Sequence, residues 1–341
     1  MKLMKTEEAV GQVLCHDITQ IIRGVTKDAV FRKGHVITEA DVPVLLSVGK
    51  DHVYIWENDE TMLHENEAAE ILRDICINEF MSASEPKEGK IELKATVDGL
   101  FTADLSRLHA INAMGRLMIA TRPSGQQVVA GDKLCGTRII PLVIEKEFME
   151  KAKGLAGDTP LLQVKPFTLK RYGIVTTGNE VFYGRIQDTF TDVIVNKMAA
   201  FGCEMAGHET CPDDHTVITA AIRKLLDAGC EAVFCTGGMS VDPDDRTPLA
   251  IKNAGTEIVS YGAPVLPGAM FLLSYMPDGR PVCGLPGCAM YAKRTIFDIV
   301  LPYLLAKEPV TAGMLARLGN GGLCLGCAEC RFPNCSFGRW Q

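Results

Sequence analysis

The chain lacks an excess of positive charge. Its 35 lysines and arginines face 42 aspartates and glutamates, which gives a net charge of −7 over 341 residues. Binding to nucleic acid through phosphates needs a basic surface, so we predict no nucleic-acid partner, while small polar or anionic ligands remain open. Aromatic residues make up only 6% of the chain, but hydrophobic residues make up 47%. This composition is typical of a globular protein, here of about two domains.

Long hydrophobic runs are also missing. Residues 1–11 carry Glu7 and Glu8 and have no apolar core of the kind that a secretory signal peptide needs. The most apolar stretch, residues 295–306, is too short to span a bilayer and contains Asp298 and Pro302, so it is typical of a buried helix. We therefore predict no export, no membrane span and a cytoplasmic location.

Cysteine is abundant, with 13 residues, but the pattern of a small disulfide-rich secreted domain is absent. Most of these cysteines are scattered singly through apolar segments, where we expect buried thiols in a reducing compartment. The last four cysteines lie close together near the carboxyl terminus, which is typical of a metal site.

The sequence pattern divides the chain into three regions. Residues 1–165 are expected to form a mixed α+β region, with a β-rich subdomain at about 90–145 and a polar linker at about 146–166. Residues 167–309 alternate β-prone runs with helical segments that end at glycines, which predicts β-α-β units and a mainly parallel sheet of the α/β class. Residues 310–341 form a cysteine-rich tail that is too short for a core of its own, so a bound metal or docking on the main body must order it.

Two glycine turns follow predicted strands of the second region, namely Thr177-Gly178-Asn179-Glu180 and Thr236-Gly237-Gly238-Met239-Ser240. Glycines allow tight turns whose backbone N–H groups can receive a phosphate, and the neighbouring hydroxyls can add hydrogen bonds. In open α/β sheets, ligands bind at the carboxyl ends of the strands, where both turns would lie. Each turn taken alone is equally well explained as a tight exit from its strand.

An acidic segment follows the second turn. Asp242, Asp244 and Asp245 lie within four residues and would repel one another unless a cation lies among them. Mg²⁺ bridging a carboxylate and a phosphate is a common solution. The alternative is that Asp245 only caps a helix that begins at Thr247-Pro248. We favour contact with a metal or a substrate.

These motifs, taken in order, resemble the molybdopterin-binding domain of the molybdenum-cofactor biosynthesis family, which includes molybdopterin molybdenumtransferase and molybdopterin adenylyltransferase. The resemblance covers about residues 170–305. The motifs that carry it are Thr176-Thr177-Gly178-Asn179-Glu180, Gly184-Arg185-Ile186-Gln187-Asp188, Pro212-Asp213-Asp214, the segment from Thr236 to Asp245, Pro267-Gly268 and Gly284-Leu285-Pro286-Gly287.

The resemblance implies a three-layer α/β/α domain, with molybdopterin or its adenylate bound at the carboxyl edge of the sheet. Asp245 matches the key acid of the family and Glu180 matches the acid of the first motif, so both are predicted as catalytic residues and Mg²⁺ ligands. A homo-oligomer is also implied. The residues predicted to contact the pterin ligand are Thr177, Gly178, Asn179, Asp213, Asp214, Thr236, Gly237, Gly238, Met239, Ser240, Pro286 and Gly287.

The sequence also departs from the family pattern. Leu266 and Ala269 stand around Pro267-Gly268, where molybdenumtransferases usually have lysines. Cys288-Ala289 replaces the usual Asn-Pro after the Gly-Leu-Pro-Gly motif, and the amino-terminal signature and carboxyl-terminal β domain of the transferase are absent. Binding of molybdopterin is therefore better supported than insertion of molybdate.

The tail cysteines, Cys324, Cys327, Cys330 and Cys335, have the spacing C-x₂-C-x₂-C-x₄-C. Four thiolates on one loop can close on a single Zn²⁺ or hold an iron–sulfur cluster. The bacterial ferredoxin run has three residues before its last cysteine and a proline after it, whereas here there are four and Pro333 precedes Cys335. The spacing favours iron–sulfur only slightly over zinc, and unligated thiols are the remaining alternative.

The resemblance therefore implies a molybdopterin-binding protein of molybdenum-cofactor biosynthesis. In an enzymatic version it inserts molybdate with Mg²⁺, as a molybdenumtransferase-type enzyme. In the alternative it is a non-catalytic carrier or sensor whose tail docks to a molybdoenzyme or another maturation protein. A third and more remote interpretation is a redox protein that uses Cys288 or the tail directly.

Overall fold

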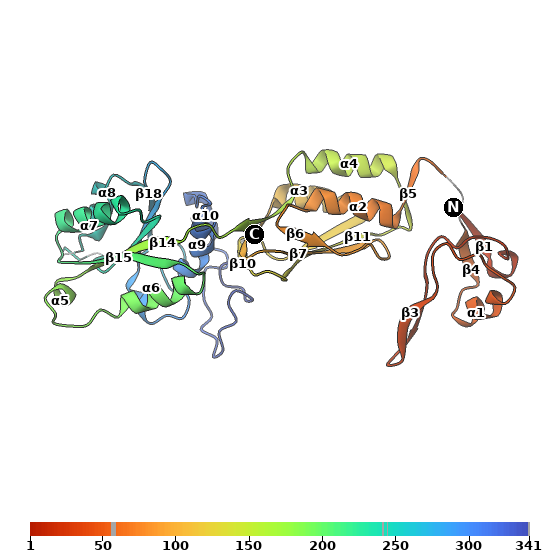
Figure 1. Cartoon of the computed structure of the whole chain (residues 1–341), viewed down its shortest axis with the longest axis horizontal. Helices are drawn as coiled ribbons and strands as arrows, with labels where there is room; N and C mark the ends of the chain where they lie inside the picture. Colours follow the sequence, from red (N-terminus) through yellow and green to blue (C-terminus); the bar gives the residue numbers. More distant parts are fainter. Residues whose placement is uncertain (56–58, 241, 244, 340–341) are drawn as a thin grey trace. The chain divides into compact units, whose positions relative to one another are not determined.

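The computed structural model describes residues 1–55, 59–240, 242–243 and 245–339 (Figure 1). The chain divides into two compact units. Unit 1 comprises Met1–Lys94, Asp104–Thr121 and Lys133–Leu162, and unit 2 comprises Ala95–Ala103, Arg122–Asp132 and Gln163–Gln341. The main division lies beside the boundary expected near residue 165, but two short segments of the predicted first region pack with unit 2.

The first part of unit 1 is built from two strand pairs and short helices. β1 (Lys2–Lys5) pairs antiparallel with β4 (His52–Ile55), and β2 (Ile18–Ile22) forms a hairpin with β3 (Thr26–Phe31). The helical elements are η1 (Thr6–Glu8) and α1 (Asp41–Ser47). Leu14, Ile37 and Leu45 are buried in a small core of their own.

The rest of unit 1 is an antiparallel sheet with three helices. Its strand order is β6-β7-β11-β9, and β5 pairs separately with β12. The strands are β6 (Met81–Ala83), β7 (Lys90–Ala95), β11 (Lys133–Ile139), β9 (Leu117–Thr121), β5 (Met62–His64) and β12 (Val143–Glu145). The helices are α2 (Glu65–Cys76), α3 (Leu105–Asn112) and α4 (Lys146–Ala156).

The segment 146–166, expected as a linker, is structured. It contains α4 and then β13 (Leu162–Pro166). The helix is amphipathic: Met149, Ala152 and Ala156 are buried along one face, while charged residues occupy the other. The polar composition that predicted a linker reflects this exposed helical face.

Unit 2 contains a six-stranded sheet with the order β15-β14-β16-β19-β18-β17. The first four strands are parallel, β18 runs antiparallel to β19, and β17 runs antiparallel to β18, so the predicted mainly parallel α/β sheet is present. The strands are β14 (Arg171–Thr177), β15 (Glu204–Cys211), β16 (Ala232–Thr236), β17 (Glu257–Tyr261), β18 (Leu272–Tyr275) and β19 (Pro281–Leu285).

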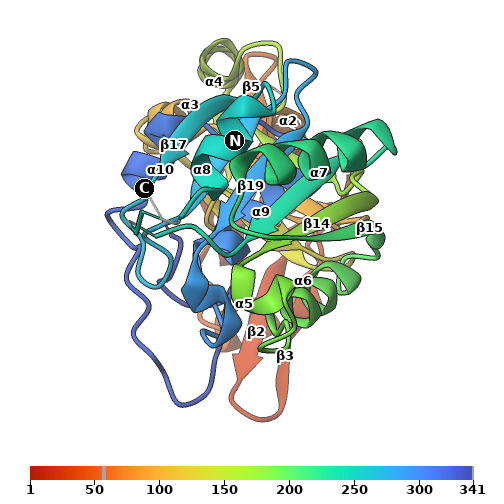
Figure 2. The same cartoon turned by 90° about the vertical axis from the view of Figure 1, so that its left-hand side faces the viewer.

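Helices cover both faces of this sheet. Successive residues of a strand point to opposite faces, and Ile174 belongs to one buried cluster while its neighbour Val175 belongs to another. The first cluster includes residues of α6 (Phe190–Ala199) and α9 (Ile296–Leu305), and the second includes residues of α7 (His215–Asp227) and α8 (Thr247–Asn253). In Figure 1 and Figure 2, α6 and α7 lie on opposite sides of β14 and β15.

The apolar segment near the carboxyl terminus forms α9, and every residue of this helix is buried. This confirms the buried helix expected at residues 295–306. Within the described part of the chain, no helix has the length and apolarity needed to cross a membrane.

A small sheet and the tail complete unit 2. The sheet has the order β10-β8-β13, with β10 (Gln126–Val128) and β8 (Gly99–Ala103). After α10 (Ala312–Arg317), the described residues of the tail form loops without a further helix or strand (Figure 2). Phe337 is buried, and Cys324, Phe332 and Cys335 pack against the core of unit 2.

Candidate functional site

Four loops leave the carboxyl ends of the parallel strands of unit 2. β14 leads through Gly178 into α5 (Asn179–Phe182), and β16 leads through Gly237 and Gly238 toward α8. β15 is followed by Pro212-Asp213-Asp214 before α7, and β19 by Pro286 and then η2 (Gly287–Met290). Since parallel strands end at the same edge, the structure places all predicted pterin-contact residues in or beside these four loops.

The turn after β16 strongly favours glycine at two positions. Gly237 has a φ of +83° and Gly238 a φ of +55°, a region that other residues rarely adopt. A Cβ atom on Gly237 would overlap the backbone carbonyl oxygen and the hydroxyl of Thr177. The two turns therefore approach each other backbone to backbone.

A hydroxyl pair joins these two turns. Thr177 Oγ1 and Thr247 Oγ1 lie 3.1 Å apart, and Thr247 Oγ1 donates to the carbonyl oxygen of Gly237 at 2.9 Å. The amide of Thr247 also donates to the carbonyl oxygen of Gly238. The sequence indicates Thr247 only as the start of a helix. Its role in holding the turn depends on Thr177, which lies 70 residues earlier in the chain.

The turn after β14 is tied to the loop after β15. The amide of Asn179 donates to Asp213 Oδ2 at 2.9 Å, and the amide of Asp213 donates to Asn179 Oδ1 at 3.3 Å. Asp214 has a different role: its carboxylate caps α7 by accepting from the amides of Thr216 and Val217. Hydrogen bonds from the Thr216 hydroxyl and amide lower the pKa of Asp214.

The acidic segment after the second turn folds as a local turn of its own. The amide of Asp242 donates to Asp245 Oδ2 at 2.9 Å, and the amide of Asp245 donates to the carbonyl oxygen of Asp242. The helix α8 has Arg246 at its N-cap position without a side-chain hydrogen bond, so the alternative that Asp245 caps this helix is wrong. Asp244, the third acid of the prediction, lies outside the described residues.

Tyr261, at the end of β17, supports the same loop. Its hydroxyl donates to the carbonyl oxygens of Met239, at 3.0 Å, and Ser240, at 3.1 Å. Burial and the negative charge of Asp245 raise the pKa of Tyr261, which keeps its donor proton in place. No local sequence signal connects Tyr261 to this loop, because β19 and β18 lie between β16 and β17 in the sheet.

The predicted contact residues differ in exposure. Glu180 and Ser240 are exposed, and the Glu180 carboxylate lies over Gly178, close to where a Cβ of that residue would be. Met239 is different: its side chain is buried against Gly284 in the core, so only its backbone can meet a ligand. Thr236 is also fully buried, and its hydroxyl has no hydrogen-bond partner in the described chain.

A polar cluster beside the first turn was not among the predicted site residues. Asp188 accepts from Thr176 Oγ1 at 3.0 Å and from the amides of Phe190 and Thr191, and Thr176 Oγ1 lies 2.9 Å from His208 Nε2. Burial acts to raise the pKa of Asp188, but the hydrogen bonds from Thr191, Phe190 and Thr176 outweigh it and lower this pKa. The pairing of β14 with β15 brings His208 here, and no local motif marks this histidine.

Eight of the scattered cysteines are buried, as expected, and Cys288 is half-buried. Burial raises the pKa of Cys288, which argues against an activated thiol at this position. The tail cysteines differ, since Cys327 and Cys330 are exposed. A hydrogen bond from the Phe332 amide and the Arg294 guanidinium lower the pKa of Cys330.

Within residues 1–55, 59–240, 242–243 and 245–339, no three His, Cys, Asp or Glu side chains are already gathered into a metal-holding group. The Mg²⁺ ligands Asp245 and Glu180 and the tail cluster therefore stay predictions.

Two protein-family models match different parts of the chain. Residues 173–306 match the model of a probable molybdopterin binding domain. Residues 3–57 match a domain of unknown function.

Curated relatives match parts of the chain, among them a molybdenumtransferase and a CinA-like protein. The molybdopterin molybdenumtransferase of Synechococcus elongatus is 23% identical over 196 residues, which cover 54% of this chain and 46% of that protein. A CinA-like protein of Mycobacterium avium is 36% identical over 90 residues, which cover 26% of this chain and 21% of that protein. The chain thus spans less than half the length of these relatives.

Similar solved structures include MoaB, a molybdopterin biosynthesis enzyme of Thermus thermophilus, with 25% identity and a TM-score of 0.36 over 41% of this chain and 98% of that one. Another is the tungsten cofactor synthesizing protein MoaB of Pyrococcus furiosus, with 18% identity and a TM-score of 0.34 over 41% and 98% of the two chains. The family model and the curated molybdenumtransferase confirm, for residues 173–306, the resemblance to the molybdenum-cofactor biosynthesis family.

Proposed function

We propose that this chain, through its molybdopterin-binding-type domain at residues 173–306, binds molybdopterin or its adenylate at the carboxyl edge of the sheet of unit 2 during molybdenum-cofactor biosynthesis. The observation that carries the proposal is the coupling of two glycine turns by the Thr177–Thr247 hydroxyl pair. These turns bring together backbone N–H groups and hydroxyls, the donors that a phosphate or pyrophosphate accepts from.

Each part of the edge has a distinct task in this proposal. The turn at Gly237-Gly238 receives the phosphate, and the exposed hydroxyl of Ser240 adds a donor. The first turn borders it, because the amides of Gly178 and Asn179 already donate to the carbonyl oxygen of Cys211 and to Asp213. The Asn179–Asp213 pair holds the first turn in place through two hydrogen bonds. Pro286 and Gly287 border the site at the end of β19.

The carboxylates of Glu180 and Asp245 are suitable ligands for a hard cation such as Mg²⁺. Glu180 is exposed, and Asp245 is half-buried with its Oδ2 accepting from the Asp242 amide, so both offer carboxylate oxygens of the kind that Mg²⁺ prefers. Mg²⁺ held there would offset the charge of the phosphate. The local turn between Asp242 and Asp245 fixes the position of the second carboxylate.

As a finer step, we propose insertion of molybdate into the bound pterin, which would take place in the cytoplasm. The chain has no lysines around Pro267-Gly268 to assist with the molybdate anion. In the structure the segment at Leu266-Pro267 holds the tail, because the backbone of Leu266 pairs with Leu323. We therefore expect turnover with molybdate to be slow relative to binding.

The experiment compares two single carboxylate removals in the full chain. Asp245→Asn keeps the shape of the side chain and removes its charge at the proposed site, while Asp278→Asn does the same in the turn before β19, at the opposite end of that strand. We expect Asp245→Asn to weaken binding of molybdopterin in the presence of Mg²⁺ by about tenfold or more, which corresponds to about 1.4 kcal/mol. Asp278→Asn should bind as the wild type does.

Equal affinities for the two variants would contradict the proposed role of Asp245, and absence of any binding by the wild type would contradict the proposed function. Adding molybdate to the wild-type complex then tests the finer step: formation of the molybdenum-containing pterin supports it, and a bound but unchanged pterin contradicts it.

A further inference from the structure

The carboxyl-terminal tail is fixed to unit 2 by backbone hydrogen bonds. The amide of Leu266 donates to the carbonyl oxygen of Gly322 at 2.8 Å, and the amide of Cys324 donates back to the carbonyl oxygen of Leu266 at 2.8 Å. Further along, the amide of Gly338 donates to the carbonyl oxygen of Gly321. The tail loop, residues 321–338, is thus closed at its base and begins beside Pro267.

All four tail cysteines line one cavity. This cavity has a volume of about 750 Å³, and residues from the tail loop and from the segment before α9 form its walls. Cys324 and Cys335 are half-buried and pack against the core of unit 2, while Cys327 and Cys330 are exposed. Two anchored thiols and two accessible thiols therefore face a common space.

Positive charge borders the same cavity. Lys293, Arg294 and Arg331 contribute to its walls and outnumber the carboxylate of Glu329 there. A metal centre with four thiolate ligands carries a net negative charge, for either zinc or a cluster in its oxidised form, so nearby cations stabilise it. The guanidinium of Arg294 also lies over the ring of Phe332, with Cζ 5.1 Å from the ring centroid.

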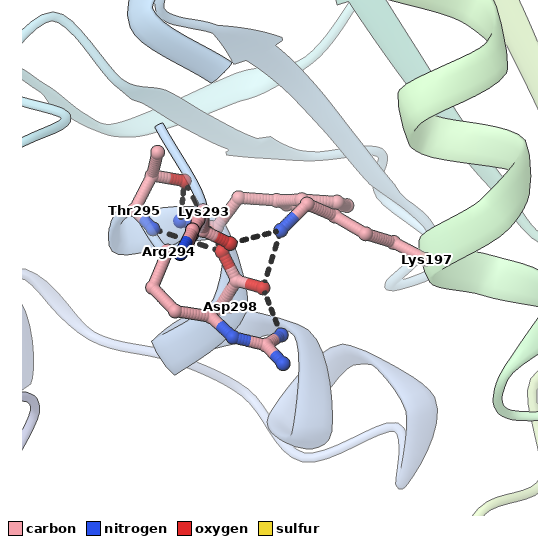
Figure 3. Close-up of polar contacts among 6 residues, drawn as sticks. Lys197, Lys293, Arg294, Thr295 and Asp298 are labelled. Atoms are coloured by element: carbon pink, nitrogen blue, oxygen red, sulfur yellow. Dashed lines mark hydrogen bonds and ion pairs between the residues drawn. The ribbon is translucent and has the colours of Figure 1, made fainter. Parts of the chain in front are cut away.

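A buried network holds Arg294 in this position. Asp298 Oδ1 accepts from Lys197 Nζ at 2.6 Å and from Arg294 Nη1 at 2.8 Å, and Asp298 Oδ2 accepts from the amide of Thr295 at 2.8 Å (Figure 3). The Asp298 side chain is only 4% exposed. The cation beside the tail cysteines is thus part of the fold of unit 2.

We propose that Cys324, Cys327, Cys330 and Cys335 hold one metal centre through four thiolates, docked on the loop at Leu266-Pro267. The spacing of the first three cysteines is the one with which bacterial ferredoxins bind an iron–sulfur cluster, so the spacing favours iron. Zinc would use the same four thiolates. Ligation brings the exposed Cys327 and Cys330 toward the anchored pair, which closes the loop over the cavity.

The test measures metal in the full chain purified without oxygen. Elemental analysis for iron and zinc, acid-labile sulfide and the visible absorption spectrum are recorded for the wild type and for the double variant Cys327→Ser/Cys330→Ser. Both replaced thiols are exposed, so the variant should keep its fold, which circular dichroism checks. Cys288→Ser, outside the tail, is the matched control.

We expect one metal centre per wild-type chain, with the same content in Cys288→Ser and at least a tenfold loss in the double variant. Iron with sulfide and a visible absorption band identifies a cluster, whereas zinc without sulfide identifies a mononuclear site, and either result supports the four-thiolate centre. A wild type that holds no metal even after incubation with Fe²⁺, Fe³⁺ and sulfide or with Zn²⁺ overturns the proposal, as does a double variant that retains its metal. The result is separable from pterin binding, because Asp245→Asn should keep the tail metal.

Discussion

Thr177 and Thr247 lie on two different loops of unit 2, and their hydroxyl oxygens are 3.1 Å apart. Both residues are buried, and Thr247 also donates to the carbonyl oxygen of Gly237. One pair of small side chains therefore sets the spacing of the two turns that form the proposed phosphate site.

The first prediction concerns this pair. Thr177→Val and Thr247→Val each replace a buried hydroxyl by a methyl group of similar size, and each should destabilise the fold by about 1–2 kcal/mol by leaving a partner unsatisfied. Because the two hydroxyls share one interaction, the double variant should lose less free energy of unfolding than the two single variants lose in sum. Denaturant unfolding of the four proteins measures this coupling. Additive effects would show that the two turns are not joined by this pair.

The second prediction uses glycine geometry. Gly237→Ala adds both the cost of a positive φ and an overlap with the backbone of Thr177. Gly255→Ala, with a φ of +94° and free space around its Cβ position, carries only the first cost. We expect Gly255→Ala to lose about 1 kcal/mol of stability and Gly237→Ala clearly more, together with its affinity for molybdopterin. Thermal unfolding and a binding assay on both variants check this. Equal losses of stability and affinity in the two variants would contradict the close approach of the two turns.

How far the sequence predicts this structure depends on whether a signal is local. The alternation in residues 171–236 predicted β14, α7 and β16 correctly, because buried strands and capped helices have short-range patterns. The positions of β8 and β10 in unit 2 could not be predicted in the same way, because β8 pairs with β13 far along the chain and β10 pairs with β8.

The same distinction applies to the candidate site. The glycine turns and the acids beside them were visible as motifs. Met239 was predicted to contact the ligand, yet its side chain is buried, because nothing local shows that Gly284 leaves space for it across the sheet. Tyr261 and His208 were missed because their partners lie elsewhere in the sequence: the partner of Tyr261 is in the loop after β16, and that of His208 is in β14.

A third prediction follows from the lowered pKa of Asp188. A carboxylate whose pKa is lower in the folded state than in the unfolded state contributes stability above its unfolded pKa, near 3.9, and loses this contribution as the pH falls through the folded value. Asp188→Asn should therefore be less stable than the wild type at neutral pH, by about 1–2 kcal/mol. The difference should shrink below about pH 4. Unfolding measured between neutral and acidic pH tests this, and a difference that does not change with pH would exclude the charge of Asp188 as its cause.

The fourth prediction concerns the buried carboxylate of Asp298. Lys197→Met removes one of its two cations and leaves the charge only partly compensated, so we expect a loss of about 3 kcal/mol. Lys252→Met, on the exposed side of α8, should change stability by less than about 0.5 kcal/mol. Chemical denaturation of both variants provides the comparison. A small effect at Lys197 would mean that Arg294 alone neutralises Asp298.

The most direct test of the central claim is hydrogen–deuterium exchange of the full chain with and without molybdopterin, in the presence of Mg²⁺ and the absence of oxygen. We expect slower exchange of the backbone amides at residues 178–180 and 237–240 when the pterin is bound, with no change at residues 276–280 before β19. Protection that appears elsewhere, or no protection at these two turns at saturating pterin, would contradict binding at the carboxyl edge of the sheet.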